Sequence, residues 1–121
     1  MKSRAWRIQN LSDIPSFGFK GMKAKALVTE KETDRMSAYD IVFPPRLSIP
    51  PSYHKVAYEI IVIQGGRGTA HMNGKDVAVK AGDVLYIPPG VWHSFSTGKK
   101  SLKILAFLTP LVNTKNDFYY E

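Results

Sequence analysis

One stretch in the second half of the chain decides the expected fold: Gly82-Asp83-Val84-Leu85-Tyr86-Ile87-Pro88-Pro89-Gly90-Val91-Trp92-His93. Its apolar segment Val84–Ile87 has the length of a short β-strand, and Gly82 and Pro88-Pro89-Gly90 interrupt regular structure on both sides. A histidine follows this second break after two residues. From these residues alone, His93 is either a metal ligand or a half-buried histidine bonded to backbone.

The same pattern of short apolar segments and Pro or Gly breaks runs through the chain and leaves little room for long helices. We expect strands at Met22–Val28, Tyr39–Phe43, Ala57–Ile63, Val84–Ile87 and Leu102–Leu108. Asn73-Gly74 predicts a hairpin, because a type I′ turn needs positive φ at both central residues. Short strands at this spacing predict an all-β protein, an antiparallel sandwich or barrel.

Length and composition exclude several classes of protein. The 121 residues predict a single domain, 1–121, and the absence of cysteine excludes disulfides and thiolate metal sites. No apolar run approaches the ~20 residues that cross a bilayer, and charge near the start argues against a signal peptide, so we expect a cytoplasmic protein without a membrane partner. The net charge of +7 is spread along the chain, which argues against specific nucleic-acid binding.

A single carboxylate, Glu59, stands inside the apolar run Tyr58–Ile63, five residues after His54. Burying an unpaired charge is very costly, so Glu59 needs a partner. That partner is a metal ion, or else a lysine or arginine such as Lys55 or Arg67.

These residues resemble the two sequence motifs of the cupin superfamily. The second motif is a glycine, five residues, Pro-x-Gly, two residues and a histidine, and Gly82, Pro88, Gly90 and His93 match it at each position. After three more residues the family usually has Asn, and this chain has Thr97.

The first motif is a glycine, five residues, His-x-His, three or four residues, Glu, six residues and a glycine. His54, Glu59 and Gly66 match it, whereas Arg46 replaces the opening glycine and Ser52 replaces the first histidine. The resemblance covers about residues 44–97.

The resemblance implies a single cupin β-barrel of jelly-roll type, with a metal held between facing strands. Carried over residue by residue, it implies metal ligands at His54, Glu59 and His93, with Ser52, a poor ligand, at the fourth position. Two histidines and one carboxylate suit one divalent ion, which we expect to be Fe, Mn, Zn or Ni. The family also implies a homodimer. Because of Ser52, loss of metal binding stays an alternative.

Two functions follow as hypotheses. The first is a mononuclear metalloenzyme, dioxygenase-, isomerase- or lyase-like, acting on a small organic molecule, with Phe95 helping to line the pocket. The alternative is a non-catalytic barrel that binds a small ligand, with or without metal, since this scaffold hosts many activities.

Three further features receive structural interpretations. Gly65-Gly66-Arg67-Gly68 is glycine-rich, but no Lys-Ser or Lys-Thr pair follows, so we predict a turn and not a phosphate loop. His71 has no motif around it and is expected to be structural or at the surface. The tail from Thr109 to Glu121 is expected to be a loop that can pack over the barrel mouth.

Overall fold

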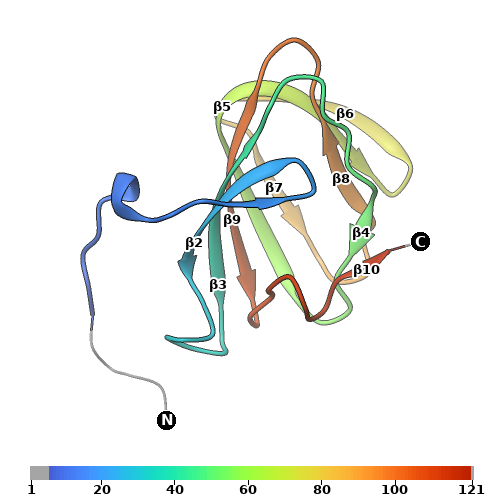
Figure 1. Ribbon diagram of the computed structural model, residues 1–121. Helices are drawn as coiled ribbons and strands as arrows, with labels where there is room; N and C mark the ends of the chain where they lie inside the picture. The colour runs from blue at the N-terminus through green and yellow to red at the C-terminus, as the bar shows by residue number, and fades with distance from the viewer. Residues whose placement is uncertain (1–5, 121) are drawn as a thin grey trace.

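Almost all regular structure in the described part of the chain, residues 6–120 of a computed structural model, is β-strand (Figure 1). One 3-10 turn, η1 (Leu11–Asp13), precedes ten strands. They are β1 (Phe17–Phe19), β2 (Met22–Val28), β3 (Ser37–Phe43), β4 (Ser52–Tyr53), β5 (Tyr58–Met72), β6 (Lys75–Lys80), β7 (Val84–Ile87), β8 (His93–Ser96), β9 (Leu102–Thr109) and β10 (Tyr119–Tyr120). The described residues contain no helix long and apolar enough to cross a membrane.

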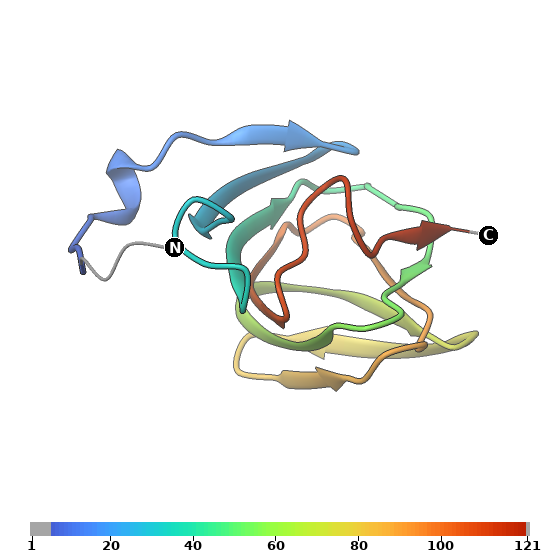
Figure 2. The same ribbon diagram turned by 90° about the horizontal axis from the view of Figure 1, so that it is seen from below.

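All strand pairs are antiparallel, and the long strand β5 joins two groups of strands. Its first half pairs with β7 and β9, and the order continues from β9 through β3 and β2 to β1. Its second half pairs with β6 and β8, and the order continues from β8 through β4 to β10. The sheet therefore curls around an interior, as seen from below in Figure 2, and the expected antiparallel barrel is confirmed.

All five predicted strands are present, and three of them, at Tyr39–Phe43, Ala57–Ile63 and Leu102–Leu108, differ at their ends from the observed strands β3, β5 and β9. Met22–Val28 and Val84–Ile87 are confirmed with their predicted bounds. The hairpin at Asn73-Gly74 is also confirmed: both residues have positive φ, 50° and 79°, and Met72 pairs with Lys75 across the turn.

The predicted turn at Gly65–Gly68 is wrong, because these residues lie inside β5. The register shifts between Ile63 and Gly65, and Gly66 has a φ of +75°. A Cβ at Gly66 would lie 1.8 Å from the Ser101 carbonyl oxygen. Glycine is needed here for a bend and for close approach of the neighbouring backbone, and not for a chain reversal.

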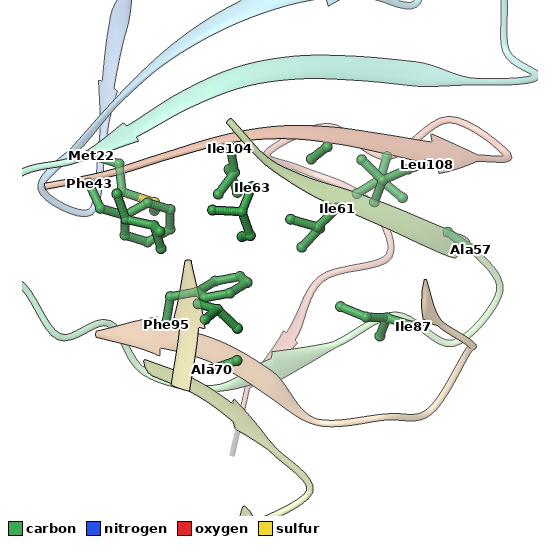
Figure 3. Close-up of a cluster of buried hydrophobic side chains, with 14 residues drawn as sticks. Met22, Phe43, Ala57, Ile61, Ile63, Ala70, Ile87, Phe95, Ile104 and Leu108 are labelled. Carbon is green, nitrogen blue, oxygen red and sulfur yellow. The ribbon is translucent and has the colours of Figure 1, made fainter. Parts of the chain in front are cut away.

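Alternation along the strands builds the core. In β9 every second residue is buried, so its apolar side chains enter the barrel while the others face out. Figure 3 shows side chains from the two sides of the barrel pointing toward one another, among them Ile61, Ile104 and Leu108 opposite Phe95 and Ile87.

The segment after β9 lies across the lower end of the barrel (Figures 1 and 2). It ends in β10, whose Tyr119 and Tyr120 pair with Tyr53 and Ser52 of β4. Val112, in the same segment, is only 1% exposed and belongs to the core. The tail predicted as a loop from Thr109 to Glu121 thus contains the end of β9 and the strand β10, and Glu121 lies outside the described residues. For the described part, the expectation that the tail packs over the barrel mouth is confirmed.

Candidate metal centre

Three buried side chains from three elements converge inside the barrel. His54 follows β4, Glu59 is the second residue of β5, and His93 begins β8. Glu59 Oε1 lies 3.4 Å from His54 Nε2 and 3.1 Å from His93 Nε2. One ligand atom from each residue lies within 4.8 Å of the other two, so all three can reach a single ion. The structure thus brings together the three residues that the sequence singled out.

Both histidines are held by their other ring nitrogen. The Nδ1 atom of His54 lies 2.6 Å from the Asp117 carbonyl oxygen, and the Nδ1 atom of His93 lies 2.9 Å from that of Val91. A carbonyl oxygen only accepts hydrogen bonds, so each Nδ1 carries the proton and donates it. In the neutral rings, Nε2 then has a free lone pair directed toward Glu59. This tautomer is the one that a metal-binding histidine needs.

The C-terminal segment also organises the loop between His54 and Glu59. The Asp117 carboxylate accepts hydrogen bonds from the backbone N–H groups of Lys55, Val56 and Ala57, at 2.6, 3.1 and 2.9 Å for the shortest contact of each. The Gly90 N–H donates to the His54 carbonyl oxygen at 2.7 Å. His54 and Glu59 can share one site despite their odd spacing because the strand is interrupted at this loop.

Burial and neighbouring charges act in opposite directions on the pKa values of the site. Burial by itself lowers the pKa of His54, but the Glu59 carboxylate and the Asp117 carbonyl oxygen outweigh it, and the pKa of His54 is raised. Burial by itself raises the pKa of Glu59, but the rings of His54 and His93, which hydrogen-bond and attract the carboxylate when they are protonated, lower it overall. Without a metal, the carboxylate is therefore charged and favours protonation of His54.

The residues present fit a divalent cation. Among the described residues, Glu59 Oε1 is a buried side-chain oxygen without a hydrogen-bond partner of acceptable geometry. Two imidazole lone pairs and this oxygen point into one small space, where three acceptors repel each other unless a cation or a proton lies between them. The structure gives neither Lys55 nor Arg67 as the partner of Glu59; its ion-pair partners are His54 and His93.

Ser52 stands at the edge of this group. It pairs with His93 across β4 and β8, is 7% exposed, and lines the same cavity as His54. The register expected from the sequence, with residues 52 and 54 on one inward side, agrees with this placement. A hydroxyl at this position can hold a water molecule or a ligand oxygen by hydrogen bonding.

A cavity of about 120 Å³ adjoins the three residues. Phe95 lines it, as the sequence predicted, together with Phe43, whose ring centroid lies 5.6 Å from that of Phe95. Phe118 lines it from the C-terminal segment and places its ring against His54, with a centroid distance of 4.9 Å.

The sequence did not indicate Asp117 or Phe118, which no motif marks. His71, expected to be structural or at the surface, lies outside the three-residue group. Its two ring nitrogens lie 2.6 Å from Asp76 Oδ1 and 2.8 Å from Ser96 Oγ. Thr97, at the position of the family's Asn, donates to the Pro44 carbonyl oxygen at 2.5 Å and accepts from the Leu47 N–H at 2.9 Å.

The small antiparallel barrel and the His-His-Glu group inside it agree with the cupin resemblance of the sequence. Comparison with protein families matches residues 39–108 to the cupin domain, and the chain therefore belongs to the cupin family.

Two comparisons find similarity to proteins from Thermotoga maritima, one to a protein sequence and one to a solved structure. An oxalate-binding protein is 42% identical over 66 residues, a match that covers 54% of this chain and 54% of that protein, so about half of the relative's length is matched. The crystal structure of a protein described as a predicted oxalate decarboxylase superposes with a TM-score of 0.77 at 26% identity, covering 87% of this chain and 100% of that one.

The nucleoside dehydratase Pac13, whose Streptomyces form has also been solved with uridine bound, has the same fold. It superposes with a TM-score of 0.80 at 12% identity and covers 97% of this chain and 92% of its own. At this identity, the likeness concerns the fold alone.

Proposed function

We propose that this cupin binds one divalent metal ion through His54, Glu59 and His93 and acts as a mononuclear metalloenzyme on a small organic molecule. The observation that carries the proposal is the convergence of three buried ligand atoms within 4.8 Å, with both histidines fixed in the tautomer that leaves Nε2 free. A bound Fe, Mn, Zn or Ni ion supplies Lewis-acid polarisation of a ligand oxygen.

The residues of the chain do the rest. His54 and His93 keep their Nε2 lone pairs aimed at the site because carbonyl oxygens hold their Nδ1 protons. Ser52 is placed to orient a water or substrate oxygen beside His93, and the apolar cavity limits access of water.

Elemental analysis of protein purified without added metal or chelator tests the proposal. We expect about one equivalent of a first-row metal, lost in Glu59→Gln and in His93→Ala while the barrel stays folded, because removing a ligand removes affinity and leaves the core intact. His71→Ala is the matched control and should keep its metal. Metal loss in His71→Ala but not in Glu59→Gln would contradict the ligand assignment.

A second candidate, a barrel that binds a small ligand without transforming it, is favoured by one observation. Ser52 replaces a histidine of the family motif, which weakens the site for a metal, and the relative that is 42% identical over 66 residues is named a binding protein. Turnover assays on metal-loaded protein separate the two, because a pure binder saturates with ligand and leaves it chemically unchanged.

A further inference from the structure

The cavity beside the three ligand residues has an apolar and largely aromatic lining. Besides Phe43, Phe95 and Phe118, the side chains of Phe19 and Ile61 line it. Its volume of about 120 Å³ is of the order of the ~150 Å³ cavity that takes up a benzene molecule. Because His54, Glu59 and His93 also line this cavity, the body of a ligand held by them is limited to about the size of one ring or a branched aliphatic group.

The positive charges around this cavity are few. Among the lining residues that the structure describes, Lys20 is the only lysine or arginine, and it is exposed. Its Nζ atom lies 4.5 Å from the ring centroid of Tyr120 and 5.8 Å from that of Phe19, at the mouth and not in the interior. A second negative charge on a ligand at the bottom of the cavity would find no cationic side chain there.

The charge balance at the site also disfavours a dianionic ligand. A divalent cation beside the Glu59 carboxylate and two neutral imidazoles carries one net positive charge. A singly charged chelating ligand neutralises this charge, whereas a dianion leaves one negative charge buried among apolar side chains, which is costly.

We propose, on the basis of the proposed metal site, that the cavity selects ligands with a monoanionic, two-oxygen chelating head and an aromatic or aliphatic body, and discriminates against small dianions such as oxalate. The head occupies the space beside Ser52, and the body lies against Phe95 and Phe118. The ligand class thus differs from that named for the Thermotoga maritima relative.

Three probes with one common head test this: benzoylformate, pyruvate and oxalate are each a carboxylate joined to a carbonyl carbon that bears a phenyl, a methyl or an oxygen anion. Each is titrated into cobalt(II)-loaded protein, and the visible absorption of the cobalt reports binding. Burial of the ring should make benzoylformate bind about 10- to 100-fold more tightly than pyruvate. Oxalate is compared with oxamate, its monoanionic analogue. The affinity of oxalate divided by that of oxamate should be smaller for the cobalt-loaded protein than for cobalt(II) in water.

A matched pair of variants locates the effect. Ala106→Leu fills the cavity from β9, where Ala106 is 2% exposed, and should abolish the preference for benzoylformate while cobalt and pyruvate still bind. The same substitution at the exposed Ala78 of β6 should change nothing. If Ala106→Leu does not fold, the wild-type titrations decide alone.

The outcomes separate the two proposals. Absence of cobalt binding would contradict the metal site itself. Cobalt binding with equal affinities for benzoylformate and pyruvate, or an oxalate-to-oxamate ratio as large as in water, would overturn the ligand class and leave the metal site standing.

Discussion

Removing the Asp117 carboxylate should lower both the stability of the protein and its affinity for a metal ion. In Asp117→Ala, three backbone N–H groups lose their acceptor. Ala57 is 1% exposed, so its unpaired N–H costs about 1–3 kcal/mol, whereas water can reach Lys55 and Val56, where the loss is about 0.5 kcal/mol each. The free energy of unfolding should fall by about 2–4 kcal/mol, which lowers Tm by about 6–20 °C at this chain length.

The same variant should also weaken metal binding. His54 and Glu59 flank the loop that Asp117 holds, and the Asp117 carbonyl oxygen fixes the His54 ring. The alanine variant keeps this carbonyl oxygen, but without the carboxylate bonds the carbonyl is no longer held in place against His54. Displacing such a supporting contact costs about 10- to 100-fold in metal affinity. Calorimetric titration with zinc and thermal unfolding of the metal-free protein measure the two effects.

Asp83→Ala is the control for this experiment. Asp83 accepts from the Lys80 N–H at 2.9 Å in a turn that lies outside the three-residue group, so its removal should cost some stability and no metal affinity. If Asp117→Ala binds zinc as tightly as the wild type and melts within ~2 °C of it, the C-terminal segment does not position His54.

Four further predictions follow from the site and the fold. In metal-free protein, the raised pKa of His54 contributes stability that is fully present below pH 6.5 and is lost as pH rises. The lowered pKa of Glu59 contributes stability that is present above pH 4.5 and is lost as pH falls. In the metal-free state, the Tm of the wild type should therefore exceed that of His54→Gln by more at pH 6 than at pH 8. In the metal-loaded state, the difference in Tm should be larger at pH 8, because protons compete with the metal at pH 6. Ser52→His should raise affinity for Ni²⁺ and Cu²⁺ most, and unchanged titration curves would mean that residue 52 does not reach the ion. Gly66→Ala should lower the free energy of unfolding in urea by about 2–5 kcal/mol, from positive φ and a backbone clash. Gly74→Ala, whose Cβ meets nothing within 4 Å, should lower it by about 1–2 kcal/mol. Light scattering should give twice the mass of one chain, as expected for the homodimer, and a monomer would contradict that expectation.

Local sequence patterns were sufficient to predict most of the fold, and the resemblance to the cupin motifs predicted the three candidate metal ligands. Val84–Ile87 and the Asn73-Gly74 turn are specified by neighbouring residues, so their structure can be predicted from the sequence alone. His54, Glu59 and His93 were predicted because they match positions of the two cupin motifs, and the structure places all three at strand ends.

The errors and omissions concern contacts between distant residues. Glycine permits both turns and bent strands, and the pairing of Gly65 and Gly66 with Lys103 and Leu102 of β9 decides for the strand. Asp117 bonds residues about sixty positions earlier in the chain, and no local pattern reports such a contact.

The continuity of β5 limits how this protein can change in length. Glu59 lies near one end of the strand, and at the other end Met72 pairs with His93. A single inserted or deleted residue between them would turn one end of the strand over relative to the other, because side chains alternate between faces. Insertions should therefore be tolerated at the Asn73-Gly74 turn and rejected within Glu59–Met72. Relatives with other ligands at this site are expected to have acquired them by substitution, with the number of residues in this strand kept constant.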